Sequence, residues 1–281
     1  MRRQTSKRII SVIKYSVISV IGFIMVYPFL WLLSASLMTV REFISVPPKL
    51  VPDVPQWGNY TAVLQRVPFF RYLLNSLVVA TSISLLVAFT SALGGYVFAK
   101  MDFTGKKTLF RFILATMMFP NFLFLIPNFF LLTRIGWVDT YLALIMPFAV
   151  SGYGIFLLRQ FIMNIPSELI ECARIDGASQ FRIFVQIIIP LSLPAMATLV
   201  LLTFVAQWNN FLWPMIITSF TPSLTTIPVG IAKLNLSFGS LANQHLVLAG
   251  MVIQVLPVIL LFLFLQRYYV KGIVMTGFGG I

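Results

Sequence analysis

Six long apolar runs alternate with more polar segments along the chain. Each run is about 19 to 27 residues long, and roughly 20 apolar residues in a helix cross the hydrocarbon core of a bilayer. The pattern therefore predicts six transmembrane helices and an all-α fold. The predicted spans are Ser16–Leu37, Leu73–Ala99, Leu109–Leu132, Tyr141–Phe161, Phe184–Val205 and Leu246–Phe264.

Composition supports a membrane protein and excludes several other classes. Of the 281 residues, 59% are hydrophobic and only 10% are charged, whereas soluble domains carry about 25% charged residues. A soluble enzyme and a disordered chain are both excluded by these values. The single cysteine, Cys172, and the single histidine, His245, exclude a disulfide framework and a zinc cluster.

The first apolar run follows a basic N-terminus and could be mistaken for a signal peptide. Its apolar stretch is too long for a signal peptide, and Ser34-Ala35-Ser36 lies too deep to be a cleavage site. We therefore expect a retained span. The expected division is residues 1–15 as the N-terminal segment, 16–37 as the first span, 38–72 as an external loop and 73–281 as the transmembrane domain.

The net charge of +13 predicts membrane topology rather than nucleic-acid binding, because the basic residues lie at the ends of the apolar runs. With both termini in the cytoplasm, 14 basic residues lie inside and six lie outside, as the positive-inside rule requires. The inside set is Arg2, Arg3, Lys7, Arg8, Lys14, Lys100, Lys106, Lys107, Arg111, Arg159, Arg174, Arg182, Arg267 and Lys271, and the outside set is Arg41, Lys49, Arg66, Arg71, Arg134 and Lys233.

Two outer loops are long. The first contains Pro47, Pro48, Pro52 and Pro55, and it is expected to be extended and irregular. The second, about Gln207–His245, contains tryptophans that fit either an interfacial aromatic belt or a docking surface. Both interpretations of these tryptophans stay open.

The acidic residues all lie in loops, which argues against an ion-coupled carrier, because such carriers usually hold their ion on an intramembrane carboxylate. They are Glu42, Asp53, Asp102, Asp139, Glu168, Glu171 and Asp176. The spans also lack the paired groups that an intramembrane enzyme needs. Near Gly105-Lys106, a phosphate loop would need a glycine at position 100, which is lysine. Any ATP chemistry must therefore belong to a partner.

Prolines and amides inside or beside the spans fit a pathway that rearranges, although proline is also common in membrane helices that only pack. The prolines are Pro28, Pro120, Pro127, Pro147, Pro190, Pro194 and Pro257. The candidate substrate contacts are Asn121, Asn128, Gln207, Asn210 and Gln254.

The segment between the fourth and fifth predicted spans, about 162–183, carries the strongest signal. Pro166 suits the first turn of a helix, and Glu168 and Glu171 lie near its positive N-terminal end. Arg174 is within reach of Glu171, and Gly177 is placed to end the helix in a left-handed turn. A short helix with a sharp glycine turn suits docking into a groove on another protein, or it lies as a connector on the membrane surface.

The residues of this loop carry a family resemblance. Glu171-Cys172-Ala173, then Gly177, then Ile187-Ile188-Ile189-Pro190 resembles the signature loop of binding-protein-dependent ABC importer permeases, with cysteine where the family usually has alanine. Further segments resemble the carbohydrate branch, similar to the second maltose-type permease. They are Asn75-Ser76-Leu77, Tyr96-Val97-Phe98-Ala99-Lys100, Phe103-Thr104-Gly105, Trp208–Pro214, Ile227–Gly230 and Gln266–Gly272.

The resemblance implies a methionine-permease-like (MetI-like) type I fold of five spans preceded by one extra helix, in a bacterial or archaeal inner membrane. It implies a second permease subunit, an ABC ATPase dimer that binds ATP and Mg²⁺, and an external solute-binding protein. This chain itself would bind no metal or cofactor, have no catalytic residue and bind no nucleic acid.

The implied coupling residues of the loop are Glu168, Glu171, Cys172, Ala173, Arg174, Asp176, Gly177 and Ala178. By resemblance the solute is a sugar. The alternatives are a permease for a polyol, glycerol phosphate or amino acid, and a channel or carrier that works without ATP.

Overall fold

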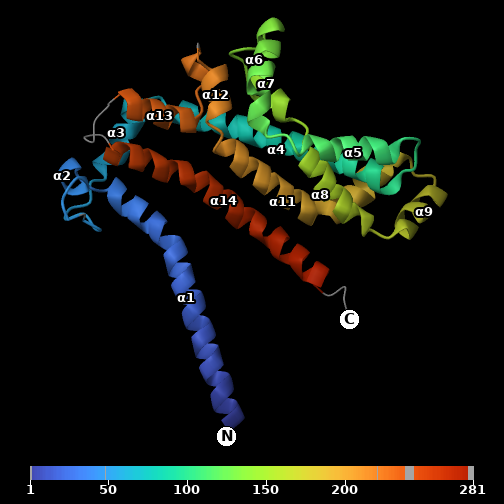
Figure 1. Cartoon of the computed structure of the whole chain (residues 1–281), viewed down its shortest axis with the longest axis horizontal. Helices are drawn as coiled ribbons and strands as arrows, with labels where there is room; N and C mark the ends of the chain where they lie inside the picture. Colours follow the sequence, from blue (N-terminus) through green and yellow to red (C-terminus); the bar gives the residue numbers. More distant parts are fainter. Residues whose placement is uncertain (1, 48, 220, 238–243, 278–281) are drawn as a thin grey trace. The chain divides into compact units, whose positions relative to one another are not determined.

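The computed structural model describes residues 2–47, 49–219, 221–237 and 244–277. Within this part of the chain all regular secondary structure is helical (Figure 1). The elements are α1 (Arg2–Ser36), α2 (Val40–Phe43), α3 (Gly58–Arg66), α4 (Phe69–Lys100), α5 (Lys106–Thr116), η1 (Asn121–Phe124), α6 (Leu125–Arg134), α7 (Tyr141–Ile145), η2 (Met146–Phe148), α8 (Gly152–Met163), α9 (Ser167–Ile175), α10 (Gln180–Ile183), η3 (Phe184–Ile188), α11 (Ile189–Trp208), α12 (Leu212–Ile217), η4 (Pro222–Leu224), α13 (Ile227–Ser237) and α14 (Gln244–Gly277).

The six predicted spans correspond to four long helical segments and two bent helix pairs. Among the described residues, four helical segments are long and apolar enough to cross a membrane, and two bent helix pairs bring the total to six if each pair counts as one span. The four are Ile13–Ser36, Phe69–Lys100, Gln180–Trp208 and Gln244–Gln266, and the bent pairs are Lys106–Thr116 with Asn121–Arg134 and Tyr141–Phe148 with Gly152–Met163.

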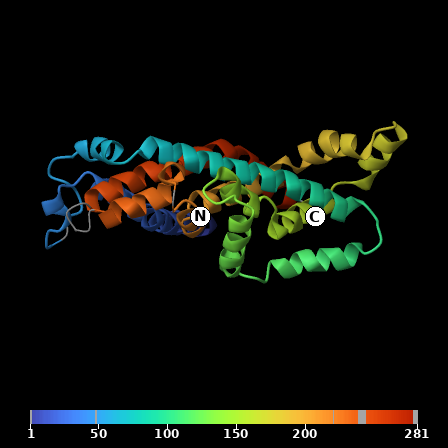
Figure 2. The same cartoon turned by 90° about the horizontal axis from the view of Figure 1, so that it is seen from above.

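The third predicted span is not one straight helix. It breaks after α5, and the next helical segment is bent from α5 by 90°, as Figure 2 shows. Pro120 lies at the break in an extended conformation. Proline has no amide hydrogen and disfavours helical geometry in the residue before it, so the sequence ends the helix there. Run length alone does not show this break.

The fourth predicted span also breaks, with a bend of 46° between η2 and α8. Ser151 has an extended conformation, and its hydroxyl accepts a hydrogen bond from the amide of Gly154 at 3.1 Å. This side-chain cap starts a new helix, because it satisfies one of the amides that the first helical turn leaves free.

The first of the two predicted long loops is irregular where its prolines lie, at residues 44–47 and 49–57, and helical on either side of them. The first contains α2 and α3, and Thr39 caps α2 through a reciprocal capping box with Glu42. This Thr-x-x-Glu spacing is visible in the sequence and is typical of a helix start. The second contains α12 and α13 rather than an open loop.

Trp208 and Trp213 in the second of these loops are buried, so neither expectation for them holds. Trp208 is buried and stacks on Phe204 with ring centroids 5.4 Å apart. Trp213 is buried as well, and its indole nitrogen donates to the carbonyl of Ala143 at 3.0 Å. Trp213 therefore fastens α12 to α7.

The chain forms two compact units. The first comprises residues 1–69 and 231–255, and the second comprises residues 70–230 and 256–281. The boundaries between them fall after the first residue of α4 and within α13 and α14.

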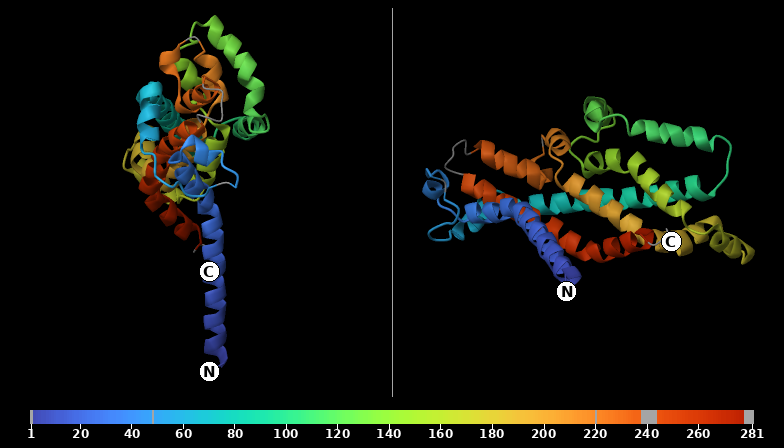
Figure 3. Two further views of the ribbon diagram at one scale, coloured as in Figure 1. Left: turned by 90° about the vertical axis from the view of Figure 1, so that its left-hand side faces the viewer. Right: turned by 60° about the horizontal axis from the view of Figure 1, so that its bottom comes forward.

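In the second unit, α4, α8 and α11 lie side by side (Figures 1 and 3). Small residues set their spacing. A Cβ atom at Gly95 would lie 2.8 Å from the amide nitrogen of Arg159, and one at Gly154 would lie 2.2 Å from the hydroxyl of Ser91. Between membrane helices close van der Waals packing stabilises association, and small residues permit it. The helices could not approach this closely with larger residues at these positions.

In the first unit, a buried amide joins the end of α1 to α3. The Asn59 amide donates to the carbonyls of Ser36 and Met38 at 2.8 and 3.0 Å. The hydroxyls of Ser36 and Tyr60 lie 2.7 Å apart in a further hydrogen bond. These contacts satisfy carbonyls at the helix end and fix where α3 begins.

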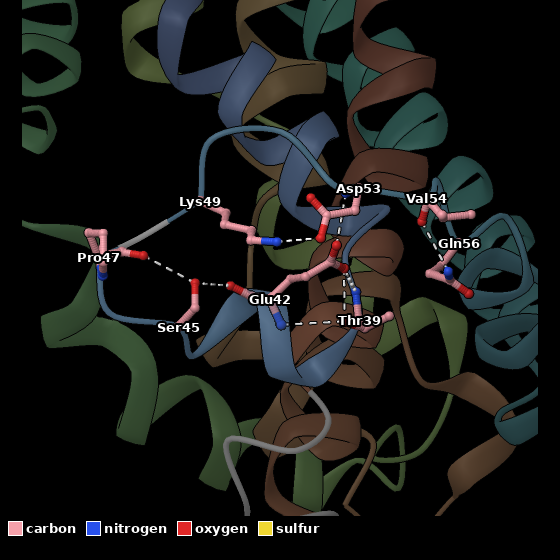
Figure 4. Close-up of polar contacts among 8 residues, drawn as sticks. All are labelled: Thr39, Glu42, Ser45, Pro47, Lys49, Asp53, Val54 and Gln56. Atoms are coloured by element: carbon pink, nitrogen blue, oxygen red, sulfur yellow. Dashed lines mark hydrogen bonds and ion pairs between the residues drawn. The ribbon is translucent and has the colours of Figure 1, made fainter.

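Glu42 organises the segment between α1 and α3 (Figure 4). Its carboxylate accepts hydrogen bonds from the amide and hydroxyl of Thr39, each at 2.8 Å, and from the amide of Asp53 at 2.8 Å. The amides of Thr39 and then Asp53 lower the pKa of Glu42 to about 2 from its ordinary value of 4.5. Lys49 pairs with Asp53 beside it. The carboxylate is therefore the acceptor that closes this loop.

We expect the Glu42 contacts to stabilise the loop fully above pH 4.5 and to weaken as pH falls towards 2, because the folded state holds the lower pKa. Glu42→Gln removes the charged acceptor and should speed hydrogen–deuterium exchange of residues 39–56 several-fold at pH 6. Asp102→Asn, at an exposed carboxylate elsewhere, is the control. Unchanged exchange in Glu42→Gln would contradict this account.

Candidate functional site

The signature loop is built around α9, whose ends the sequence defines. Pro166 precedes the helix in an extended conformation, Glu168 lies in its first turn and Arg174 in its last turn. These charges complement the helix dipole, with the negative group at the positive end and the positive group at the negative end. The helix thus begins and ends where the sequence predicts.

A Schellman motif ends α9. The amide of Ala178 donates to the carbonyl of Ala173 at 2.9 Å, and the amide of Gly177 donates to the carbonyl of Arg174 at 3.0 Å. Gly177 has a φ of +78°, which L-residues with a Cβ rarely adopt. Free space surrounds its Cα, since a Cβ there would meet no atom within 4 Å. The glycine is required by the backbone and not by crowding.

The helix has one buried and one exposed face. Ile170 is buried, and Ala173 and Ala178 pack against the same core cluster. The other predicted coupling residues, Glu168, Glu171, Cys172, Arg174, Asp176 and Gly177, are exposed. The structure therefore gathers the predicted residues on one short helix, with Ala173 directed to the core and Cys172 to the surface.

Two apolar residues of this surface were absent from the predicted set. Ile175 is 85% exposed and Leu169 is 45% exposed. Ile175 stands between the charged residues Arg174 and Asp176, at the end of the helix. An isoleucine at the last position of a capped helix, flanked by charges, was the signal that could have identified it. Leu169 lies in the first turn of α9 and Ile175 at its last position, so they are two separate exposed apolar positions on this helix.

The expected pair of Glu171 and Arg174 is not formed. In the described part of the chain the ion pairs join Lys49 to Asp53 and Lys106 to Asp102. Spacing of three residues on one helix permits the pair but does not ensure it.

The candidate substrate contacts are scattered over several elements. Gln207 and Asn210 are joined by a hydrogen bond of 3.1 Å at the end of α11. Asn121 begins η1 and is exposed, whereas Asn128 lies half-buried in α6. Gln254 lies in α14, in the first unit. Among the described residues no group of three or more His, Cys, Asp or Glu side chains could hold a metal ion.

A second polar site, missed by the site prediction, surrounds Asn75 near the start of α4. The Asn75 amide nitrogen donates to the carbonyls of Ser223 and Thr225 at 2.9 and 2.8 Å, and its oxygen accepts from the Tyr141 hydroxyl at 2.6 Å. The neighbouring Ser76 hydroxyl accepts from the amide of Ile227 at 2.8 Å. Asn75 is 2% exposed. This junction holds the connection between α12 and α13 to α4.

Known proteins resemble this chain over most of its length. The family model of the binding-protein-dependent transport system inner membrane component matches residues 90–275. The arabinooligosaccharides transport system permease protein AraQ of Bacillus subtilis is 34% identical over 257 residues, covering 90% of each chain. The sn-glycerol-3-phosphate transport system permease protein UgpE of Pectobacterium atrosepticum is 34% identical over 246 residues, covering 85% of this chain and 87% of the relative.

Among solved structures, a chain of a bacterial ABC transporter involved in the import of the acidic polysaccharide alginate superposes with a TM-score of 0.78. It is 25% identical and covers 94% of this chain and 98% of that chain. The fold expected from the signature loop is therefore confirmed.

Asn75→Leu should destabilise the second unit, because it removes the Asn75 donor from the buried Thr225 carbonyl and the acceptor from the Tyr141 hydroxyl, at roughly 1–3 kcal/mol for a buried group, whereas the Ser223 carbonyl keeps Arg71 as a donor. Tyr141→Phe removes one of these hydrogen bonds and should cost less. The measurement is the thermal unfolding midpoint of the purified protein in detergent. Equal midpoints for Asn75→Leu and the unchanged protein would refute the role of this junction.

Proposed function

The chain belongs to the family of binding-protein-dependent transport system inner membrane components, and we propose that it forms half of the pathway of a sugar importer in a bacterial or archaeal inner membrane. In this proposal a second permease subunit forms the other half, and an external solute-binding protein delivers the sugar. Two ATPase subunits bind ATP and Mg²⁺ and supply the energy. The chain itself is a transport subunit without catalytic residues.

The exposed end of α9 is the observation that carries the coupling role. Ile175, flanked by Arg174 and Asp176, forms a small mixed surface at the C-terminal end of a capped helix. A short helix that enters a groove of a partner needs an apolar contact at its centre and polar groups around it. Closure of the ATPase subunits would push on this surface and move the spans attached to it.

A sugar oligomer is the substrate class that the relatives favour. The relatives named above transport arabinooligosaccharides or sn-glycerol-3-phosphate, and the solved neighbour takes part in alginate import. The hydrogen-bonded amides of Gln207 and Asn210 suit recognition of hydroxyl groups. Glycerol phosphate is the second candidate, since both relatives are equally similar to this chain.

Competition separates the two candidates. Uptake of labelled arabinooligosaccharide should fall when unlabelled oligosaccharide is added and stay unchanged when sn-glycerol-3-phosphate is added. Uptake of labelled sn-glycerol-3-phosphate that falls with unlabelled sn-glycerol-3-phosphate and not with the oligosaccharide would favour glycerol phosphate.

The single cysteine reports the proposed topology. Cys172 is exposed on α9, and the excess of Lys and Arg on that side favours a cytoplasmic α9. A membrane-impermeant maleimide should label Cys172 in inverted membrane vesicles and not in intact cells. In a Cys172→Ser background, Val46→Cys should be labelled in intact cells, because Val46 is 94% exposed in the opposite loop. Labelling of Cys172 in intact cells would show that the orientation is the opposite of the one proposed.

Gly177→Glu should uncouple ATP hydrolysis from uptake. The substitution adds a side chain at a left-handed residue, at about 1–2 kcal/mol of backbone strain, and places a charge at the docking surface. Gly105→Glu is a matched control, since Gly105 has a φ of +85° and also has no atom within 4 Å of a built Cβ. The measurements are uptake and ATP hydrolysis at equal protein levels.

The docking role fails if Gly177→Glu supports normal uptake, or if Gly105→Glu is equally defective. The second result would assign the defect to backbone strain in general.

A further inference from the structure

The last turn of α4 holds the chain where it enters the loop of α9. The Lys100 ammonium donates to the carbonyl of Ile165 at 2.5 Å, to the carbonyl of Met163 at 3.3 Å and to the hydroxyl of Ser167 at 3.3 Å. Met163 ends α8 and Ser167 begins α9. A cation at the negative end of α8 satisfies carbonyls that the helix itself leaves free. The entering leg of the loop is thus attached to α4.

The same face of α4 holds the chain where it leaves the loop. The hydroxyl of Tyr96 and the side-chain oxygen of Gln180 are hydrogen-bonded at 2.8 Å. The Tyr96 ring stacks on Phe184, with centroids 5.9 Å apart and an angle of 28°. Tyr96 is 1% exposed. Gln180 begins α10 and Phe184 begins η3, so the leaving leg is attached to α4 as well.

Tyr96 and Lys100 are four residues apart, so both side chains lie on one face of α4. The backbone of α4 is fixed against α8 at the same level, because Gly95 allows contact with the Arg159 amide and the Arg159 side chain donates to the Phe98 carbonyl at 3.1 Å. The loop joins α8 to α11 in sequence, but both of its ends are held by a third helix.

We propose that Tyr96 and Lys100 are positioning residues that make the α9 loop and α4 move as one body. This inference rests on the proposed coupling role of α9. A displacement of α9 by the ATPase then reaches α4 directly, in addition to α8 and α11. Without the two attachments, α9 can tilt about its two connections while α4 stays in place.

The test uses the complete transporter with its binding protein in lipid vesicles. Lys100→Met keeps the length of the side chain and removes its donors, Lys100→Arg keeps a cationic donor, and Tyr96→Phe removes the hydroxyl. Lys107→Met is the matched control, because Lys107 is an exposed cation on the neighbouring α5. Uptake and ATP hydrolysis are measured on equal amounts of assembled complex.

We expect Lys100→Met to hydrolyse ATP while transporting about tenfold less solute, so that the ATP used per solute rises about tenfold. Tyr96→Phe should show a smaller rise in this ratio. Lys100→Arg should restore most of the coupling, and Lys107→Met should leave the ratio unchanged.

The inference is overturned if Lys100→Met and Tyr96→Phe keep the normal ratio of ATP to solute. It is also overturned if uptake and hydrolysis fall in parallel, since that is the result of a structural defect, or if Lys100→Arg is as uncoupled as Lys100→Met. If the unchanged transporter takes up solute without ATP, the proposed function itself is wrong, which distinguishes the two failures.

Discussion

A membrane segment must satisfy its own backbone hydrogen-bonding groups, because the hydrocarbon core offers no water to do so. Continuous helices meet this requirement, and α1 and α14 continue past Pro28 and Pro257. Where the third and fourth spans break, carbonyls and amides lose their helical partners. The rest of the structure depends on which other groups form hydrogen bonds with these carbonyls and amides.

One of these replacement partners comes from α4, which also holds irregular segments away from the two breaks. Its side chains donate to carbonyls of three separate segments: Asn75 to the connection before α13, Thr90 to the Ala149 carbonyl at 3.0 Å, and Lys100 to the end of α8. The single hydroxyl hydrogen of Thr90 is shared between the Ala149 carbonyl, at the break in the fourth span, and the carbonyl of Leu86 on its own helix at 2.8 Å. Each donor holds a segment whose position the lengths of the apolar runs do not predict. α4 is therefore the helix against which the irregular parts of the second unit are arranged.

This arrangement connects the fold to the transport function. The surface of α9 that is proposed to meet the ATPase is small, and its own buried contacts, such as Ile170, are few. A rigid attachment is needed if a push on this surface is to move membrane helices rather than deform a loop. The Schellman turn at Gly177 sets the direction of the chain after α9, and the contacts with α4 attach both ends of the loop to that helix.

The sequence predicts the features that depend on local chemistry. Apolar runs define the spans, and the sequence from Pro166 to Gly177 defines α9 with its start and end, because proline, charge placement and glycine act within a few residues. It does not predict features decided by distant partners. Lys100 reaches a carbonyl 65 residues away, and Tyr96 reaches a side chain 84 residues away. The pair of Arg174 and Glu171 is likewise not formed among the described residues, and the buried indole of Trp213 donates to a carbonyl of α7, 70 residues away.

The most direct test of the account is purification of the tagged chain from its native membrane in mild detergent, with mass spectrometry of the proteins that accompany it. The account predicts recovery of an ABC ATPase together with a second permease subunit. Recovery of the chain alone, from membranes that contain both proteins, would contradict the role of α9 as the point of attachment to an energy-supplying partner.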